Sequence, residues 1–363
     1  MKIGIDISQI IYEGTGVARF TRGLVQTIIN NDNENNWIFL FSSLRGRLDD
    51  QIKREIDKKG FKLINCKLPP FLLSFIWNDL HILSPDFALG KLDWLITSDW
   101  TDPPSKIKKA TIVHDLVYKR YPETVSNMIR TTQEKRIKWV KKETRLIFAD
   151  SEATKKDLIE LEGVADKKIK VIYPGVEVVK PNKQQVEKTL NKYHLKKSFI
   201  LTVGKIEPRK NIKRLLEAYY NLNNKNVDLV IVGPEGWDNK TVNNLSCGVH
   251  YLGYLSNIEL YSLMSACLVF VYPSIWEGFG YPVIEAMSLG APVCTSNNSS
   301  LAEIVNNNAV LFDPFKTEEI AISLNKLIND SDLKNRLILE GRTISSKFNW
   351  KNYYNQLIKS LSL

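Results

Sequence analysis

Cysteine is scarce in this sequence, and long apolar runs are missing from it. The 363 residues include four cysteines without a CxxC pair, and Cys267 and Cys294 stand in apolar stretches where a small buried thiol fits. We therefore expect reduced, structural cysteines in a cytosolic protein. The longest apolar stretches, 70–77 and 266–276, fall well short of the ~20 residues that cross a bilayer. Asp6 interrupts the amino-terminal run "MKIGIDISQII", so we expect neither a secretory signal nor a membrane span.

Two patterns that mark other enzyme classes are also missing. A nicotinamide-dependent oxidoreductase carries GxGxxG directly after its first strand, but here "GTGVAR" puts Arg19 in the place of the third glycine. No His or Cys group has the spacing of a zinc site. The one Asp-x-Asp triplet, Asp330, Ser331 and Asp332, falls in a polar break where Asp and Ser serve as turn and cap residues. We therefore expect no metal and no redox cofactor.

The sequence does contain a regular alternation of strand-like and helical patterns. Its composition, 44% hydrophobic and 25% charged, is that of a globular protein, and its length exceeds what one core usually serves. Runs such as "KIGIDI", "WIFLFSS" and "ATIVHD" in the first half, then "FILTVG", "VDLVIVG" and "LVFVYPS", predict parallel strands covered by helices. The expected fold class is α/β, with two Rossmann-like doubly wound domains.

We place the domain boundary in a polar, basic stretch that follows a Pro-Gly pair. The expected parts are a first domain over 1–178, a linker over 179–198, a second domain over 199–345 and a terminal helix over 346–363. In the last part Trp350, Tyr353, Tyr354 and Leu357 recur at helical spacing. That apolar face needs a partner, which either domain could supply.

The net charge of +10 has its densest basic segment at 134–145. On a continuous helix Lys135, Lys138, Lys142 and Arg145 would share one stripe, opposite an apolar face that contains Ile137, Val140 and Ile147. The plain interpretation is a solvated charged face. The alternative is peripheral contact with acidic lipid headgroups, which attract clustered lysines.

A candidate phosphate site follows the first strand pattern of the second domain. Phe199 to Val203 reads as a strand, Gly204 allows a turn, and a helical stripe begins near Ile212. Arg209 and Lys210 would then stand beside a helix start at the carboxyl edge of a parallel sheet. Free N–H groups, the helix dipole and two cations together favour a diphosphate there.

A second strand, loop and helix carries two carboxylates. In "SIWEGFGYPVIEAMSLGAP", Glu277 lies in the loop and Glu285 in the first turns of the following helix. Gly278 and Gly280 let the backbone approach a ligand. Each carboxylate could accept hydrogen bonds from two neighbouring hydroxyls of a sugar or a ribose. A loop charge and a surface helical residue are the alternatives.

The segment "EGFGYPVIE" resembles the Glu-x7-Glu signature of the family 4 glycosyltransferases, which have the GT-B fold. The resemblance covers nearly the whole chain and is carried, in the family's order, by "YEGTGVARFTRGLV", "VHDLVYKRYPE", "ADSEATKKDL", "VIYPGVE", "GKIEPRKN", "LVIVGPEGW", "VHYLGYLSNIELYSLMSAC", "PSIWEGFGYPVIEAM" and "TSNNSSLAEIV". Within the family, these segments are most similar to those of the mannosyltransferases of bacterial O-antigen and polysaccharide assembly.

The resemblance implies a role for each matching residue. Arg209 and Lys210 would neutralise the donor diphosphate, Glu285 would hold the ribose and Glu277 the transferred sugar. The other implied positions are His114 against the sugar, Gly204 and the backbone of Phe279, Gly280 and Tyr281 beside the donor, and Gly14 and Gly16 facing the phosphates or the acceptor from the first, acceptor-side domain. From its residues alone, His114 at a strand end could equally be a structural group.

The resemblance also implies a retaining, metal-independent transfer from a nucleotide sugar, with GDP-mannose preferred and UDP-, ADP- and dTDP-sugars left open. The expected acceptor is a glycan or a lipid-linked oligosaccharide, and the expected location is the cytoplasm, at most peripheral on the inner face of the membrane. No nucleic-acid partner is expected. The alternatives are another GT-B enzyme, such as a sucrose-type transferase or an epimerase, and a non-catalytic module that binds nucleotide sugar or glycan.

Overall fold

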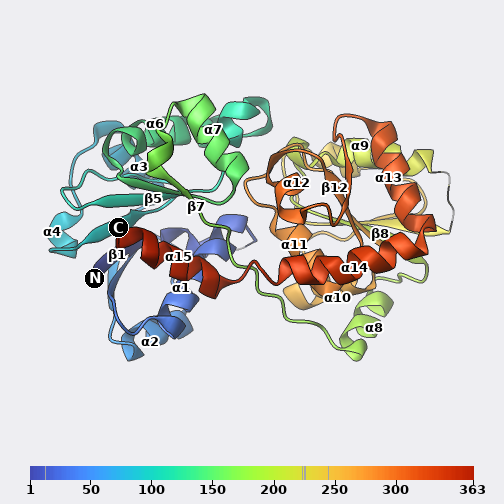
Figure 1. Cartoon of the computed structure of the whole chain (residues 1–363), viewed down its shortest axis with the longest axis horizontal. Helices are drawn as coiled ribbons and strands as arrows, with labels where there is room; N and C mark the ends of the chain where they lie inside the picture. Colours follow the sequence, from blue (N-terminus) through green and yellow to red (C-terminus); the bar gives the residue numbers. More distant parts are fainter. Residues whose placement is uncertain (13, 223, 225, 244) are drawn as a thin grey trace. The chain divides into compact units, whose positions relative to one another are not determined.

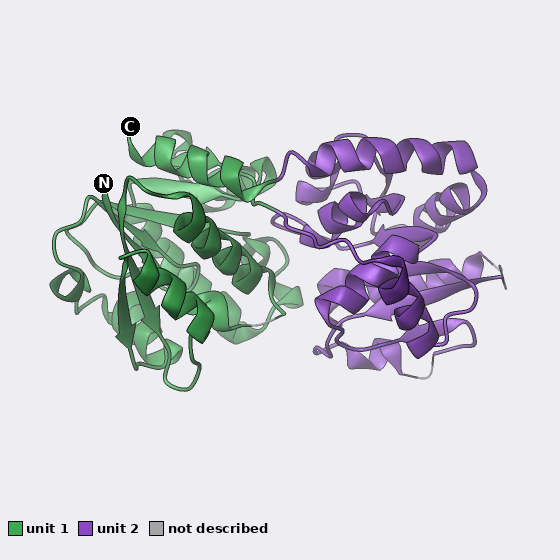
Figure 2. Ribbon diagram, turned by 90° about the horizontal axis from the view of Figure 1, so that it is seen from below, with its two compact units in different colours: residues 1–175, 349–363 green, residues 176–348 purple. Residues whose placement is uncertain are grey.

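The chain forms two compact units, which are coloured separately in Figure 2. The structure is a computed structural model and describes residues 1–363 except 13, 223, 225 and 244. Unit 1 comprises Met1–Gly175 and Asn349–Leu363, and unit 2 comprises Val176–Phe348. Each unit has its own sheet and its own core, so each is described by itself.

Unit 1 is built on a parallel sheet of the strand order β3-β2-β1-β4-β5-β6-β7 (Figure 1). Its strands are β1 (Lys2–Asp6), β2 (Asn36–Ser42), β3 (Lys62–Cys66), β4 (Trp94–Thr97), β5 (Lys109–Val113), β6 (Leu146–Ala149) and β7 (Ile169–Val171). Its helices are α1 (Gly16–Asn31), α2 (Asp50–Lys58), α3 (Pro70–Ser74), α4 (Asp86–Leu89), α5 (Val117–Arg120), α6 (Asn127–Glu143), α7 (Glu152–Glu162) and α15 (Trp350–Leu361), with a π-helical turn, η2 (Phe75–Leu80), directly after α3. Helices α1, α2 and α15 lie on one face of the sheet, and α3, α6 and α7 lie on the other.

Unit 2 has a parallel sheet of the order β10-β9-β8-β11-β12-β13. Its strands are β8 (Ser198–Val203), β9 (Val227–Val232), β10 (Val249–Tyr251), β11 (Val269–Tyr272), β12 (Val293–Ser296) and β13 (Val310–Phe312). Its helices are α8 (Lys183–Lys192), α9 (Ile212–Asn221), α10 (Asn257–Ala266), α11 (Tyr281–Leu289), α12 (Ser299–Val305), α13 (Thr317–Asn329) and α14 (Ser331–Ser345). The sheet order reverses direction between β8 and β11, which is the position where ligands bind in open α/β sheets.

Local sequence explains why the central strands lie where they do. Strands β4, β5, β6, β9, β11 and β12 are buried along their whole length, as expected of parallel strands covered on both faces. In unit 2, Leu215 of α9 and Leu324 of α13 pack with Ile200 and Val271 of the sheet into one core. The carboxyl ends of β8 and β11 are thereby held side by side.

The terminal helix α15 belongs to unit 1, where it packs on α1. Phe20 of α1 makes edge-to-face contacts with Trp350 and Tyr353, at ring-centroid distances of 5.4 and 5.3 Å. A Cβ atom on Gly23 would lie 2.2 Å from the Trp350 ring, so this glycine makes room for the helix. The sequence left the choice of partner open, and the structure selects the first domain.

The stretch expected as a linker carries structure of its own. The boundary between the units lies at Gly175 and Val176, and helix α8, within the predicted range 179–198, packs on α10 in unit 2. Asn182 and Gln185 form a capping box at its start. In its contacts the segment is therefore part of unit 2.

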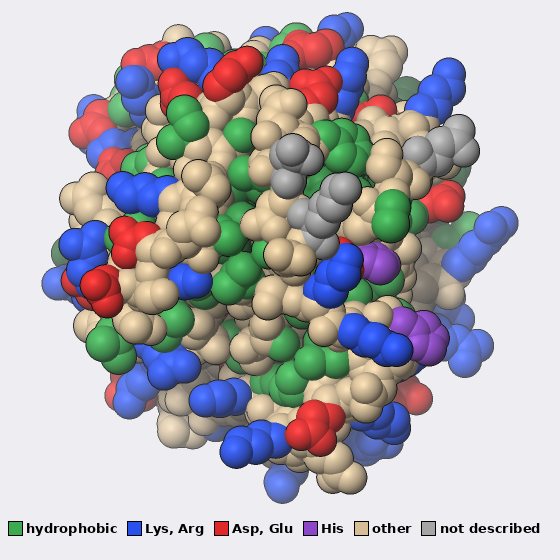
Figure 3. Space-filling view, turned by 90° about the vertical axis from the view of Figure 1, so that its right-hand side faces the viewer, with side chains coloured by type: hydrophobic (Ala, Val, Ile, Leu, Met, Phe, Trp, Pro, Cys, Tyr) green, Lys and Arg blue, Asp and Glu red, His purple; other side chains and the backbone are tan. Residues whose placement is uncertain are grey.

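Charged side chains of both signs are exposed on the surface. On the face drawn in Figure 3, blue Lys and Arg side chains alternate with red carboxylates, and hydrophobic side chains form small groups between them. Within the described part of the chain, no helix has both the length and the hydropathy needed to cross a membrane.

The predicted basic stripe is wrong at its carboxyl end. Helix α6 stops at Glu143, because Thr144 turns to an extended conformation and the Arg145 backbone N–H donates to Lys109 O in the adjoining strand. Ile147 is a residue of β6. The helical part of the stripe therefore consists of Lys135, Lys138 and Lys142, opposite buried Ile137 and Val140.

Candidate active site

The loop after β8 presents two cations at the carboxyl edge of the unit 2 sheet. Arg209 and Lys210 lie in a short 3-10 turn, η5 (Pro208–Lys210), directly before α9. Asn211 ends this turn in the left-handed region, at φ 59°, and its side-chain amide donates to the carbonyls of Pro273 and Pro314 at 3.1 and 2.7 Å. The first bond holds the turn against the loop that follows β11, and the second holds it against the loop that follows β13.

Glu277 lies between these two cations. Its Oε2 is 2.6 Å from Arg209 Nη1, and its Oε1 accepts from Lys210 Nζ at 2.6 Å. Oε1 also accepts from Ser274 Oγ at 2.6 Å and from Tyr272 Oη at 3.1 Å. Arg209, Lys210 and Glu277 were each singled out from the sequence, and the fold brings them together from the loops after β8 and β11.

The surroundings fix the charges of this cluster. Burial raises the pKa of the Glu277 carboxyl, but the charges of Arg209 and Lys210 outweigh burial and hold that pKa at about 2. Burial lowers the pKa of the Lys210 amino group, and Arg209 beside it lowers that pKa further. Arg209 Nη2 also donates to Glu207 Oε1 at 2.9 Å. Two cations and two carboxylates thus form a compact, charge-balanced group.

The backbone of the Glu277 loop is held from a neighbouring helix. Ser300 Oγ of α12 donates to the carbonyls of Glu277 and Phe279, at 2.9 and 2.8 Å. Gly280 precedes α11 with φ 101°, and a Cβ atom there would lie 2.7 Å from Leu301 Cδ2. Glycine is needed at this position both for the turn and for the packing of α12. Phe279 is buried, and its ring meets that of Tyr281 edge to face at 5.1 Å.

Glu285 lies in α11, one turn beyond the loop, and is nearly fully buried, with 1% of its surface exposed. Its Oε1 accepts a hydrogen bond from Tyr261 Oη of α10 at 3.2 Å. A surface position for Glu285 is excluded, and so is a solvated loop charge at Glu277, which is 8% exposed. A buried carboxylate that already receives a hydroxyl donor has the chemistry needed to accept another hydroxyl.

Gly204 directly follows β8 with φ 156°, and a Cβ atom there would approach the Lys210 side chain to 3.2 Å. The lysine side chain therefore runs over this glycine on its way to Glu277. A larger residue at 204 would displace the lysine.

In unit 1, His114 follows β5 and forms a partly buried ion pair with the buried Asp150, with Nδ1 2.6 Å from Oδ2. Burial lowers the pKa of the His114 imidazole, but Asp150 outweighs this effect and raises the pKa to about 9, with smaller contributions from Asp99 and Asp115. The ring lies edge to face against Phe20 of α1, at a centroid distance of 4.7 Å. His114 is thus a fixed cation at neutral pH.

Gly14 and Gly16 stand at the start of α1, the helix that carries Phe20. Gly14 has φ 79°, and Gly16 is the first helical residue after Thr15, whose hydroxyl accepts from the Ala18 N–H at 3.2 Å. The contact between Phe20 and His114 therefore places the glycine turn and the histidine at the same edge of the unit 1 sheet.

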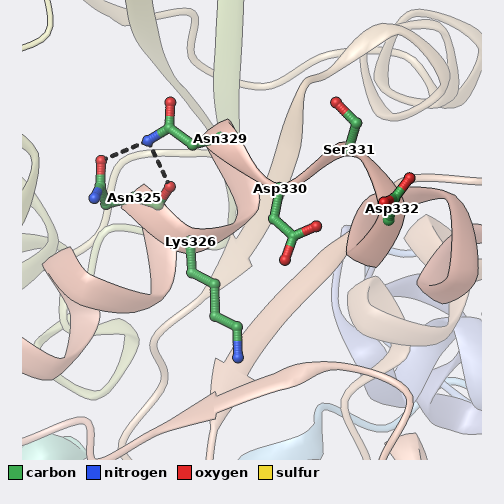
Figure 4. Close-up of a pocket in the computed structure, with 6 residues that line it drawn as sticks. All are labelled: Asn325, Lys326, Asn329, Asp330, Ser331 and Asp332. Atoms are coloured by element: carbon green, nitrogen blue, oxygen red, sulfur yellow. Dashed lines mark hydrogen bonds between the residues drawn. The ribbon is translucent and has the colours of Figure 1, made fainter.

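The Asp-x-Asp triplet is a helix cap. Asp330 Oδ1 accepts from the Leu333 N–H at 2.9 Å at the start of α14, which confirms the predicted cap. Figure 4 shows Asp330 and Asp332 pointing in different directions from the rim of a shallow hollow between α13 and α14. The described residues contain no group of three or more His, Cys, Asp or Glu side chains placed to hold a metal ion.

Sequence reasoning missed several residues of these clusters. In unit 2 they are Glu207, Tyr261, Tyr272, Ser274 and Ser300, and in unit 1 Asp150. Ser274 and Tyr272 stand three and five residues before Glu277, so their nearness in the chain was a usable signal. Asp150 is 36 residues from His114, and only the pairing of β5 with β6 brings it near.

Comparisons with known proteins identify the family of this chain. Residues 14–180 match the family model "Glycosyltransferase Family 4", and residues 183–344 match "Glycosyl transferases group 1". O-antigen chain mannosyltransferase B of Escherichia coli is 27% identical over 382 residues, which cover 100% of both chains. Serotype-specific mannosyltransferase WbdA of Escherichia coli is 31% identical over 221 residues, 57% of this chain and 27% of that protein.

Among solved structures, HepE of Anabaena in complex with UDP and glucose superimposes with a TM-score of 0.73 at 18% identity, covering 100% of this chain and 99% of that one. This likeness confirms the predicted GT-B fold. Because the two family models together span nearly the whole chain in the expected order, the chain belongs to the family 4, group 1 glycosyltransferases and is an enzyme of that class.

Proposed function

We propose that this enzyme transfers a hexose from a nucleotide sugar to a hydroxyl of a growing, lipid-linked glycan, with retention of the anomeric configuration and without a metal ion. The observation that carries the proposal is the cluster of Arg209, Lys210 and Glu277 at the reversal point of the unit 2 sheet. Two partly buried cations that already hold a carboxylate are suited to hold a diphosphate, which presents the same kind of oxygen atoms.

These residues would act mainly on the leaving group. As the bond between the anomeric carbon and the phosphate oxygen breaks, its electron pair stays on the diphosphate, and Arg209 and Lys210 stabilise the added negative charge. A preorganised donor of this kind is commonly worth ~3 to 4 kcal/mol in a dry site. The acceptor oxygen then bonds to the anomeric carbon from the same face, and its proton passes to the leaving phosphate. No protein base is required by this sequence of events.

The two carboxylates would position the donor. The pKa of Glu277 is about 2, so its carboxylate is ionised at neutral pH and can accept hydrogen bonds from hydroxyls of the sugar. Glu285 would accept from the ribose hydroxyls, beside Tyr261. In unit 1, His114 would face the sugar, and the turn of Gly14 and Gly16 would face phosphate or acceptor.

Our preferred donor is GDP-mannose, from which mannose would be transferred, because the full-length relative and WbdA are both mannosyltransferases. A UDP-sugar is the second candidate, since HepE was solved with UDP and glucose. The relative's O-antigen assignment supports a polysaccharide acceptor in the same way.

The first experiment measures calorimetric binding of GDP, UDP, ADP and dTDP and of their common sugar conjugates, with EDTA present. We expect tight binding of one base, retained in EDTA and weakened in Glu285→Ala. The exposed Glu340→Ala in the same unit is the matched control. Binding that EDTA abolishes would contradict the metal-free proposal.

Release of nucleoside diphosphate in the presence of acceptor then distinguishes the enzyme from a binding module. The wild-type chain should turn over the nucleotide sugar that it binds. In Lys210→Gln the turnover rate should fall about a hundredfold, as expected for removal of one preorganised hydrogen-bond donor. Tight donor binding without any transfer to polyprenyl-diphosphate-linked glycans would contradict the proposed reaction.

A further inference from the structure

The last helix of the chain reaches the candidate active-site residues of unit 1. Helix α15 packs on α1, and Tyr353 of α15 is almost fully buried, with 1% of its surface exposed (Figure 1). The Tyr353 ring meets the Phe20 ring of α1 edge to face at a centroid distance of 5.3 Å, and the same Phe20 ring meets the His114 ring at 4.7 Å. A residue near the carboxyl end of the sequence thus lies one aromatic ring away from His114.

His114 itself is held by the segment that follows β6. Asp150 binds the side chain, with Oδ2 2.6 Å from Nδ1 of the imidazole. Thr154 of α7 binds the main chain, since its Oγ1 donates to the His114 carbonyl at 3.0 Å. The pair with Asp150 keeps a proton on Nδ1, so that Nε2 is the ring nitrogen left for a substrate.

Asp150 and Tyr353 each contain one polar atom that is not hydrogen-bonded. Asp150 is 3% exposed, and among the residues that the structure describes neither its Oδ1 nor Tyr353 Oη has a hydrogen-bond partner. Proteins seldom leave buried polar atoms in this state, because the cost of removing them from water is then uncompensated. The two atoms are complementary, since an ionised carboxylate only accepts hydrogen bonds and a phenol can donate one.

The two groups lie close enough to influence each other. Burial raises the pKa of the Tyr353 hydroxyl well above its usual value, and the negative charge of Asp150 raises that pKa further. A phenol that keeps its proton remains a hydrogen-bond donor at neutral pH. This is the kind of group that Asp150 Oδ1 requires.

The other carboxylates near His114 have partners of their own. Asp99 Oδ1 lies 3.3 Å from Nη1 of the buried Arg136, and Asp115 Oδ1 accepts from the first backbone N–H of α5 at 3.0 Å. Both contribute less than Asp150 to the raised pKa of His114. Asp150 is therefore the carboxylate whose orientation governs the imidazole.

We propose that Tyr353 is a positioning residue of the transfer reaction, whose hydroxyl donates to Asp150 Oδ1 and so fixes the carboxylate that orients His114. The hydroxyl reaches the carboxylate by a small side-chain rotation or through one bridging water, and either arrangement satisfies both buried atoms. The inference rests on the proposed function, in which His114 faces the sugar. It goes beyond that function because it makes the terminal helix a part of the catalytic arrangement.

The first test is the turnover rate of Tyr353→Phe, which removes the hydroxyl and keeps the ring against Phe20. We expect kcat to fall about tenfold with KM for the donor unchanged, because a hydrogen bond to a charged group is lost and only the geometry of the reacting groups is affected. The matched control is Tyr354→Phe, which removes a hydroxyl of the same helix that is hydrogen-bonded to Asp32. The control should leave kcat unaltered. Equal kcat values for the two variants would show a merely structural role and overturn the inference.

A second readout needs neither donor nor acceptor. In proton NMR, the hydrogen in the short bond between His114 and Asp150 should give a downfield resonance that is absent from His114→Gln. Tyr353→Phe should shift or broaden this resonance, and Tyr354→Phe should leave it in place. An unchanged resonance in Tyr353→Phe would overturn the inference. A changed resonance in a chain that shows no transfer would uphold the link from Tyr353 to His114 and overturn the proposed function instead.

Discussion

At the scale of single residues, Glu277 does two things that compete. In the structure it is the counter-ion of Arg209 and Lys210, and in the proposed reaction it would hold the sugar while those cations bind the diphosphate. Binding of the donor must therefore exchange one set of charge pairs for another. Tyr272 can guide the exchange, because its hydroxyl accepts from Lys210 Nζ at 2.7 Å and donates to Glu277 Oε1.

Replacing Tyr272 with Phe removes this link and leaves the ring in place. We expect kcat/KM for the donor to fall about tenfold, the size expected for loss of a hydrogen bond to a charged group. The fall should be confined to catalysis and donor binding, with thermal unfolding little changed. Tyr219→Phe, which removes a hydroxyl bonded to Val227 O elsewhere in unit 2, is the control and should leave kcat/KM unaltered.

The His114 and Asp150 pair predicts a stability that depends on pH. The folded state raises the pKa of His114 from 6.5 to about 9, so its contribution is fully present below pH 6.5 and is lost as the pH rises through 9. The largest contribution would be of the order of 3 kcal/mol. Urea unfolding of the wild type and His114→Gln should therefore differ more at pH 6 than at pH 10, with the exposed His194→Gln as the control. An equal difference at both pH values would show that the ion pair does not carry the effect.

Local sequence identified the charged residues of the candidate site but not the groups that orient them. Arg209, Lys210 and Glu277 stand in strand, turn and helix patterns that reveal the sheet edge. Tyr261 and Asp150 come from elements whose contacts with the site depend on helix packing and strand pairing. Nothing in a local pattern indicates that Tyr261 of α10 will meet Glu285.

At the scale of elements, the strands that sequence patterns did not reveal are the four edge strands of the described sheets, β3, β7, β10 and β13. A central parallel strand is covered on both faces and reads as a continuous apolar run, whereas an edge strand is partly solvated and mixes polar residues into its pattern. Strand β3, "KLINC", shows this mixture and is partly exposed throughout. These edge strands form because each one pairs with a neighbouring strand, and the local sequence does not show that pairing.

Packing of α15 on α1 predicts a local loss of stability. Leu357 is fully buried in α15, so Leu357→Ala should lower the free energy of unfolding of unit 1 by about 2 to 5 kcal/mol. Hydrogen exchange should show the loss in α1 and the unit 1 strands, with unit 2 unchanged. Gln356→Ala, on the exposed side of the same helix, should cost little. Equal loss in both units would contradict the assignment of α15 to unit 1.

At the scale of the whole molecule, the two units differ in how the chain builds them. Unit 2 is one continuous segment, while unit 1 needs both ends of the chain, because α15 returns to pack on α1 after unit 2 is complete. Removal of residues 349–363 should therefore damage unit 1, although it takes nothing from unit 2. Four of the charged residues proposed to contact the donor, Arg209, Lys210, Glu277 and Glu285, lie within the continuous segment, whereas His114 lies in unit 1.

A chain restricted to residues 176–348 should consequently fold and bind the donor nucleotide on its own, without any transfer activity. Its core is self-contained, since α9, α13 and the strands of one sheet supply it. Calorimetry of this segment should give nearly the affinity of the full chain, and Lys210→Gln within it should weaken binding. If the segment shows native circular dichroism and cooperative unfolding but binds no nucleotide, then the cluster around Glu277 is insufficient, and groups of unit 1 such as His114 must take part in holding the donor.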